Sequence, residues 1–272
     1  MGISIRDSSG SDARTGSSTS SDPDKADSLA DYARLLETVR RDYDRAEAMY
    51  ERAIEADPAN ARHIGNYANF LQNVRRDYDR AEALYERAIK TNPNYTHGIS
   101  NYARFLQNVR RDYDRAETMY ERAIKTNPNH AYSLGCYAVF LETVRRDYDR
   151  AETMYERAIK TNPNHAINLG NYAEFLHDVR RDYDRAEAMY ERAITADPNH
   201  AYSLGGYAVF LRNVRRDYDR AEAMYERAIT ADPNHAHLLR HYANFLRNVR
   251  RDYDRAEALY ERAIEADTNN GQ

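Results

Sequence analysis

The chain has 272 residues, of which 31% are charged, and its formal net charge is −4. This near-neutral balance gives no reason to expect a polyanionic partner, and no apolar run approaches the ~18 residues of a membrane span. A single cysteine, Cys136, excludes an internal disulfide framework and fits a reducing compartment. We therefore expect a soluble cytoplasmic protein without a membrane partner.

Residues 1–26 are rich in Ser, Asp and Gly and hold almost no large apolar side chains. Such a segment cannot bury enough surface to offset the entropy lost on ordering, so it is predicted to be disordered.

From Asp27 onward a single 35-residue unit recurs. The string Arg-Arg-Asp-Tyr-Asp-Arg-Ala-Glu begins at Arg40, Arg75, Arg110, Arg145, Arg180, Arg215 and Arg250. We divide 27–267 into seven repeats, at about 27–58, 59–93, 94–128, 129–163, 164–198, 199–233 and 234–267. A short polar tail, 268–272, follows them.

The fourth repeat, 129–163, illustrates the unit. Apolar residues spaced by three and four predict a first helix: Leu134, Tyr137, Ala138, Leu141 and Val144. A second helix is predicted by Ala151, Met154, Tyr155, Ala158 and Ile159. Asp147 is a candidate N-cap for this second helix, and Pro163 ends it. Neither helix can bury its apolar stripe alone, so neighbouring hairpins must stack into a continuous core.

The small and large residues of this unit resemble the tetratricopeptide repeat, through Leu134, Tyr137, Ala138, Leu141, Ala151, Tyr155, Ala158 and Pro163. The resemblance covers about 27–267 and implies an all-α, right-handed superhelical solenoid of seven antiparallel helix hairpins. Two departures are the missing glycine before the turn and one extra residue between the helices. The strings Tyr-Ala-x-Phe-Leu and Tyr-Glu-Arg-Ala-Ile also resemble, more weakly, the half-a-tetratricopeptide (HAT) repeats of RNA-processing scaffolds.

Differences between the repeats are confined to one face of the first helix. Counted from its constant tyrosine (Tyr137 in the fourth repeat), positions −5, −1, +2, +5 and +6 vary, and at ~100° per residue they cluster on one side. The second helix hardly varies. In tetratricopeptide proteins the first helices line a concave groove, so the resemblance puts this variable stripe where ligands bind.

The variable stripe holds amides, two aromatic–aliphatic pairs and charges of both signs. A side-chain amide can both donate to and accept from one peptide unit, so a row of asparagines would suit an extended peptide. The pairs Tyr132–Val139 and Tyr202–Val209 are candidate anchor pockets. The predicted peptide-binding groove comprises Asn66, Asn69, Asn73, Asn101, Arg104, Asn108, Tyr132, Val139, Asn171, Glu174, Tyr202, Val209, Asn244 and Asn248. The alternatives are a merely solvated polar face and, for the aromatic pairs, shielding of neighbouring repeats.

The sequence gives little support for nucleic-acid binding, metal binding or catalysis. The arginine pairs are matched by carboxylates within each unit, which disfavours nucleic acid as a partner. His235, His237 and His241 have no carboxylate or cysteine beside them in their helix, and Cys136 has no activating neighbour. We therefore predict no catalytic residue, cofactor or metal. Glycines recur at position −2 and are expected to permit close helix packing: Gly65, Gly135, Gly170 and Gly205.

The sequence thus favours a non-enzymatic adaptor that binds an extended peptide segment in its groove. The alternatives are a structural or self-assembling scaffold, whether a designed or a recently duplicated array, and an RNA-processing scaffold of the HAT type. The last repeat keeps the interior pattern through Leu259, Tyr260, Ala263 and Ile264, with no capping helix predicted after it. Homotypic association through this repeat is therefore expected.

Overall fold

The computed structural model describes residues 22–270, except for the side chains of 269 and 270. In this part of the chain there are fourteen helices and no strand. The helices pair in chain order into seven antiparallel hairpins, one for each predicted repeat, which confirms the all-α solenoid. Each of these helices is too short or too polar to cross a bilayer.

The first helix of each hairpin is called the inner helix and the second the outer helix. The inner helices are α1 (Pro23–Leu35), α3 (Ala61–Phe70), α5 (Thr96–Phe105), α7 (Ala131–Phe140), α9 (Ala166–Phe175), α11 (Ala201–Phe210) and α13 (Ala236–Phe245). The outer helices are α2 (Tyr43–Ala56), α4 (Tyr78–Thr91), α6 (Tyr113–Thr126), α8 (Tyr148–Thr161), α10 (Tyr183–Ala196), α12 (Tyr218–Ala231) and α14 (Tyr253–Asn270).

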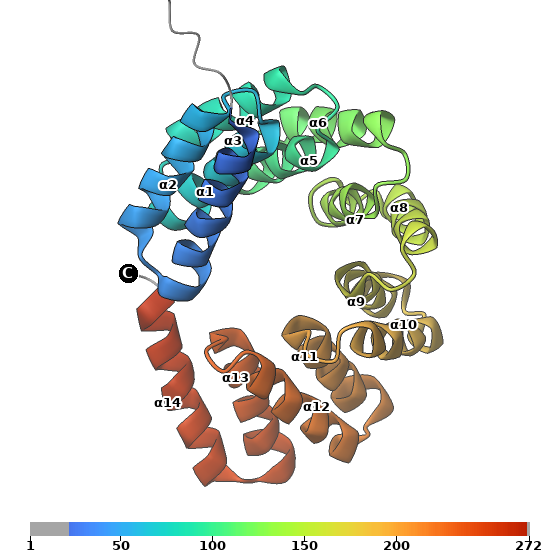
Figure 1. Ribbon diagram of the computed structural model, residues 1–272. Coiled ribbons are helices and arrows are strands. Elements are labelled where there is room, and N and C mark those ends of the chain that lie inside the picture. The colour runs from blue at the N-terminus through green and yellow to red at the C-terminus, as the bar shows by residue number, and fades with distance from the viewer. Residues whose placement is uncertain (1–21, 271–272) are drawn as a thin grey trace, which may run out of the picture.

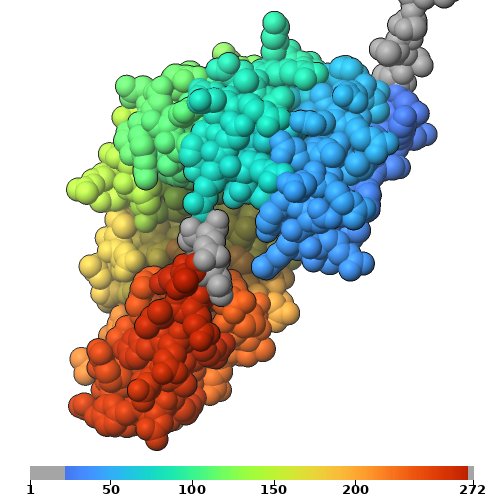
Figure 2. Space-filling view, turned by 90° about the vertical axis from the view of Figure 1, so that its left-hand side faces the viewer, coloured from blue at the N-terminus to red at the C-terminus, as the bar shows by residue number. Residues whose placement is uncertain are grey.

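The hairpins stack side by side and curve around an open centre, with the inner helices on the concave side (Figure 1). Each inner helix contacts the inner helix of the next repeat, whereas contacts between successive outer helices are sparser. The inner wall is therefore the shorter one, and the stack bends toward it. Figure 2 shows that the two ends are displaced from each other, so the solenoid does not close into a ring.

The turn inside each hairpin absorbs the extra residue of the 35-residue repeat. Every inner helix passes into five residues of π-helix: Leu36–Arg40, Leu71–Arg75, Leu106–Arg110, Leu141–Arg145, Leu176–Arg180, Leu211–Arg215 and Leu246–Arg250. The next residue is always the second arginine of the pair, with a left-handed φ between 53° and 60°. In the fourth repeat, the N–H groups of Arg146 and Asp147 both donate to the carbonyl of Leu141. Arginine thus takes the left-handed conformation that glycine usually adopts after a helix.

Caps and prolines decide where the helices begin and end. Asp147 caps α8 as predicted, because its carboxylate accepts from the Arg150 N–H at 3.2 Å. Thr268 stands where a proline follows the other outer helices, so α14 runs on to Asn270, into the predicted polar tail. At the other end Asp22 caps α1, which begins at Pro23. The disorder predicted for 1–26 is therefore wrong for its last residues, and residues 1–21 lie outside the described part.

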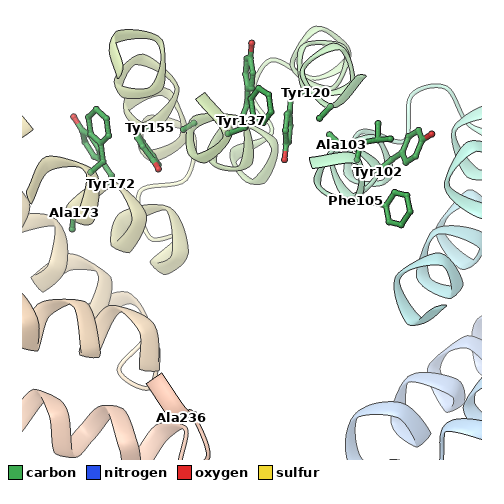
Figure 3. Packing of buried hydrophobic residues seen from close by; sticks show 14 of the residues in the cluster. Tyr102, Ala103, Phe105, Tyr120, Tyr137, Tyr155, Tyr172, Ala173 and Ala236 are labelled. Atoms are coloured by element: carbon green, nitrogen blue, oxygen red, sulfur yellow. The ribbon is translucent and has the colours of Figure 1, made fainter. Parts of the chain in front are cut away.

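Stacked aromatic rings join each repeat to the next. Tyr120 of α6 stacks on Tyr137 of α7 (Figure 3), with ring centroids 5.6 Å apart. The ring centroid of Tyr120 also lies 5.3 Å from that of Phe140. The equivalent tyrosine pair occurs at all six junctions, with centroids 5.4–5.8 Å apart. All six phenylalanines are buried. These aromatic rings belong to the continuous core that the apolar stripes of the stacked hairpins predicted.

The charges of the repeated string pair between neighbouring repeats. Between repeats four and five, Glu152 accepts from Arg180 Nε at 2.7 Å and from Arg185 Nη1 at 3.2 Å. Arg180 also binds Asp149 at 2.6 Å, while the Tyr172 hydroxyl donates to Glu152 at 3.2 Å. The same ion pairs recur at all six junctions. Since the six outer helices from α2 to α12 all make this junction, their sequences hardly vary.

Two glycines allow close approach between inner helices. A Cβ on Gly135 would meet the Asn168 Oδ1 at 2.0 Å, and a Cβ on Gly205 would meet the Leu238 Cδ2 at 2.2 Å. Both contacts are too short for a real side chain unless the neighbour moves. The predicted packing role of the inner-helix glycines is confirmed at these positions.

Candidate functional site

Three pockets lie along the inner helices, and each spans three consecutive repeats. The N-terminal pocket (390 Å³) involves α1, α3 and α5, the central pocket (300 Å³) α5, α7 and α9, and the C-terminal pocket (490 Å³) α9, α11 and α13. Variable positions of the inner helices contribute to the wall of each pocket. The variation between repeats therefore falls on side chains that face the concave hollows.

The central pocket brings together the first predicted anchor pair, Tyr132 and Val139. The Tyr132 hydroxyl donates to Asn101 Oδ1 at 2.8 Å and accepts from Arg104 Nη1 at 2.8 Å, which holds the ring across the repeat boundary. Ile167, an exposed apolar side chain of α9, completes the apolar part of the wall. The lining residues are Arg104, Gln107, Asn108, Tyr120, Tyr132, Gly135, Cys136, Val139, Ile167, Asn168 and Asn171.

The C-terminal pocket contains the second predicted pair, Tyr202 and Val209. Tyr202 is 47% exposed, and its hydroxyl donates to the carboxylate of Glu174. His177 is buried with its ring edge toward Phe210, at a centroid distance of 5.4 Å. The lining residues are Glu174, His177, Asp178, Arg181, Tyr183, Tyr190, Tyr202, Gly205, Gly206, Val209, Asn213, Val214, His235, His237, Leu238 and His241.

The N-terminal pocket is polar and has no aromatic–aliphatic pair of this kind. Arg62 takes the position of Tyr132 and Tyr202 in its repeat and binds Asp27 at 2.6 Å. The same Asp27 oxygen lies 2.8 Å from Nε2 of the buried His63. Charged groups that already pair with each other fill much of this wall, so it offers little apolar surface to a ligand.

The predicted asparagines differ in what their side chains contact. Three are acceptors for the protein's own tyrosines: Asn69 for Tyr85 at 2.6 Å, Asn101 for Tyr132 at 2.8 Å, and Asn244 for Tyr260 at 2.8 Å. Asn66 and Asn171 line the N-terminal and central pockets, and the exposed ones are Asn73, Asn108 and Asn248. The row of amides at position −1 is thus interrupted at Asn101, whose carbonyl positions Tyr132.

Carboxylates occupy the middle of the inner wall, between arginines in earlier and later repeats. Burial raises the pKa of Glu142 to about 7, against the hydrogen bond from Tyr155, and the charges of Glu174 and Asp178 raise it further. Burial also raises the pKa of Glu174. The arginines are Arg104 before this acidic stretch and Arg212, Arg240 and Arg247 after it.

Burial shifts the pKa values of His241 and of the cysteine in the pocket walls. Nε2 of His237 and Nε2 of His241 lie 3.0 Å apart, and burial, with His237, Arg212 and Arg240 nearby, lowers the pKa of His241 to about 4. Burial raises the pKa of the Cys136 thiol. Within residues 22–268 no group of three or more His, Cys, Asp or Glu side chains is arranged to hold a metal ion.

Several pocket residues were missed by the sequence analysis, and Ile167 and His177 are two of them. Ile167 stands at position −5, the same position as Tyr132 and Tyr202, and His177 stands at position +5 of its repeat. Reading every repeat at position −5, rather than its tyrosines alone, would have identified Ile167.

Family models match successive parts of the chain. The PRP39 C-terminal HAT repeat model matches residues 54–177, the TmcB tetratricopeptide model 211–272, and two further tetratricopeptide models 176–213 and 41–60. The chain therefore carries tetratricopeptide-type repeats, which are matched segment by segment by different models. Both resemblances found in the sequence are therefore confirmed. No curated protein matches the chain.

Solved structures share the tetratricopeptide fold at low sequence identity. Yeast Tom70 aligns with a TM-score of 0.67 and 19% identity, over 90% of this chain and 53% of Tom70. A tetratricopeptide repeat protein from Parabacteroides merdae gives 0.61 and 18%, over 89% of this chain and 93% of its own. A monomeric mutant of IFIT1 with Gppp-AAAA gives 0.68 and 16%, over 88% and 58%. This chain thus spans about half of Tom70, and at these identities the likeness establishes the fold alone.

Proposed function

We propose that this chain is a non-catalytic adaptor that binds an extended peptide segment of another protein along its inner helices. Tetratricopeptide repeats generally mediate protein–protein interaction. In the proposed complex two apolar side chains of the peptide enter the central and C-terminal pockets. The polar side chains around those pockets hold the backbone between them.

The observation that carries the proposal is the pairing of equivalent apolar side chains in two pockets. Tyr132 with Val139, and Tyr202 with Val209, hold positions −5 and +2 of their repeats, two repeats apart. Tyr202 and Ile167 remain about half exposed, at 47% and 50%, although the rest of the repeat has an efficient core. Partly exposed aromatic and aliphatic side chains in a hollow are typical anchors of binding energy.

Charge indicates which peptides would fit. Glu174 and Asp178 lie in the wall of the C-terminal pocket, and Arg104 in that of the central pocket. A peptide with one basic residue near its centre and acidic residues toward one end would complement this arrangement. RNA is disfavoured, because its phosphates would meet the carboxylates while the junction arginines are already paired.

The test is a selection from a displayed library of random extended peptides, followed by calorimetric titration of a selected peptide. Tyr202→Ala and Ile167→Ala should each weaken binding by roughly tenfold or more, since anchor truncations commonly cost over 1 kcal/mol. Glu174→Lys should weaken a peptide with a central basic residue. Unchanged affinity in all three variants would disprove groove binding.

Glu55→Lys is the matched control for Glu174→Lys. Glu55 lies exposed on the outer helix α2, and the equivalent positions of the next three repeats carry Lys90, Lys125 and Lys160. Glu55→Lys and Glu174→Lys change the charge equally, and position 55 tolerates lysine. Peptide affinity should therefore stay that of the unmodified chain.

A further inference from the structure

We propose that copies of this chain associate head to tail, with the last repeat of one copy docking on the first repeat of the next. The docking would reproduce the junction that already joins the repeats within the chain. This interaction is separate from the groove, because it uses the two ends of the solenoid rather than its inner wall.

The last repeat presents the acidic half of a junction. Asp254 and Glu257 of α14 stand at the positions that bind the first arginine of the next repeat elsewhere, and Glu261 follows one turn later. The side chains equivalent to Glu257 in earlier repeats are 18–20% exposed, whereas Glu257 itself is an exposed residue. Tyr260 is half-buried, although its six equivalents are buried. Ile264 is 67% exposed.

The first repeat presents the basic and aromatic half. Arg40 and Arg45 are exposed, and Tyr32 is 40% exposed while its equivalent Tyr67 is 4% exposed. Arg45 donates to the Tyr32 hydroxyl at 2.6 Å, just as Arg80 donates to Tyr67 at 2.5 Å. This half of the junction is therefore already arranged as it is inside the chain.

A hollow of 490 Å³ lies on this first face, where a preceding repeat would pack. It is lined by Tyr32, Leu35, Leu36, Arg40, Asp42 and Arg45. At the internal junctions a tyrosine ring of the preceding outer helix covers the equivalent surface. The ring centroid of Tyr50, for example, lies 5.8 Å from that of Tyr67 and 5.3 Å from that of Phe70. Tyr260 of a second copy is the matching ring.

The two faces are complementary in shape and in charge. By analogy with the internal junctions, Glu257 would bind Arg40 and Arg45 of the next copy, Asp254 would bind Arg40, and Tyr260 would stack on Tyr32. Such a contact joins different surfaces of two copies, so it leaves one free face at each end and continues the superhelix.

The intermolecular junction should be weaker than an internal one. Helix α1 has 13 residues where α3 has 10, and α14 has 18 where α12 has 14. The additional residues lie at the start of α1 and at the end of α14, where internal repeats are joined by a short linker. In a docked pair both ends would have to fit into the space of that linker. Association should therefore be reversible and depend on protein concentration.

The test uses sedimentation velocity of the 272-residue chain over a range of concentrations. The sedimentation coefficient of the unmodified chain should rise with concentration. One variant, Glu257→Arg with Glu261→Arg, makes the last face basic; a second, Arg40→Glu with Arg45→Glu, makes the first face acidic. Each variant alone should raise the dissociation constant by roughly tenfold or more, because like charges then meet.

Mixing the two variants provides the decisive measurement. The unmodified acidic face of the second variant still fits the unmodified basic face of the first, so the mixture should form complexes that neither variant forms alone. This recovery also shows that both variants are folded. Glu265→Lys, on the same helix at a position where other repeats carry lysine, should associate like the unmodified chain. A concentration-independent monomer for the unmodified chain, or no complex on mixing, would overturn the proposal.

Discussion

The outer helices and the inner helices of this solenoid differ in how freely their residues vary. Each outer helix from α2 to α12 supplies the same carboxylates and the same tyrosine to the next repeat, as Glu152 and Tyr155 do in the fourth. The inner helices keep their buried face but change at the positions that reach the pockets. The surface that joins repeats is thus uniform along the chain, while the surface left toward the centre is individual to each repeat.

This difference separates two physical tasks. A junction used six times needs the same partners at each place, because one carboxylate such as Glu152 accepts from two arginines and a tyrosine at once. A pocket wall has no such internal demand, so its side chains can suit something outside the chain. Asn101 shares features of both cases. It stands at a position that differs between repeats, yet its side chain accepts the hydrogen bond that holds Tyr132 in place.

The strongest way to test the comparison is to truncate one tyrosine from each region. Tyr137→Ala removes a buried ring that stacks on Tyr120, and should lower the free energy of unfolding by about 3–5 kcal/mol. Tyr202→Ala should change it by less than about 1 kcal/mol, because the ring is half exposed. Tyr132→Ala should fall between them. Urea denaturation measures all three, and equal losses would mean that core and pocket wall are not distinct.

The junction carboxylates can be tested next. Glu152→Ala leaves Arg180, Arg185 and Tyr172 without a shared acceptor, so it should reduce the free energy of unfolding by about 1–3 kcal/mol. The loss should shrink at high salt. Glu265→Lys, with no junction partner among the described residues, should have an effect within about 0.5 kcal/mol. An equally small effect for Glu152→Ala would show that packing alone joins the repeats.

The raised pKa of Glu142 makes the stability of the fold sensitive to pH. Burial raises this pKa to about 7 from an ordinary value of 4.5, so between these limits the folded state binds a proton that the unfolded state releases. The contribution of Glu142 to stability should therefore fall as pH rises through this window and stay constant above it. Glu142→Gln should remove this decline and be more stable at pH ~8 by about 1–2 kcal/mol, a discounted value because the carboxyl is only half-buried.

The check is thermal unfolding from pH ~4 to ~8. Glu55→Gln, which changes an exposed carboxylate of an outer helix, serves as the control and should keep the pH profile of the unmodified chain. Parallel profiles for Glu142→Gln and the unmodified chain would show that Glu142 titrates normally.

The smallest expected effect concerns the turn. Arg146 has a φ of 56°, and glycine adopts this conformation without steric strain, so Arg146→Gly should stabilise the fold by about 0.5–1 kcal/mol. Arg145→Gly, one residue earlier, should destabilise it instead, because Arg145 binds Glu117 and Asp114 of the previous repeat. A comparison of the two melting temperatures distinguishes strain in the turn from loss of the junction.

Much of the fold was determined by the sequence itself. Hydrophobic spacing defined both helices of each hairpin, Asp147 marked a helix start, and the constant aromatic residues proved to be core. Asp22 and Pro23 also mark the start of the first helix in the sequence. The prediction of disorder for this segment relied on its composition instead. These features depend on residues within a few positions of one another, which is why they can be read from the sequence.

Only the tertiary structure decided which partners the polar residues have. Glu152 and Arg180 are 28 residues apart, and Asn101 and Tyr132 are 31 apart, so their contacts depend on how one hairpin packs against the next. Identical asparagines therefore ended in different roles, Asn101 as an internal acceptor and Asn171 in a pocket wall. A local period specifies each hairpin, whereas the rotation between hairpins is set by side chains meeting across the junction.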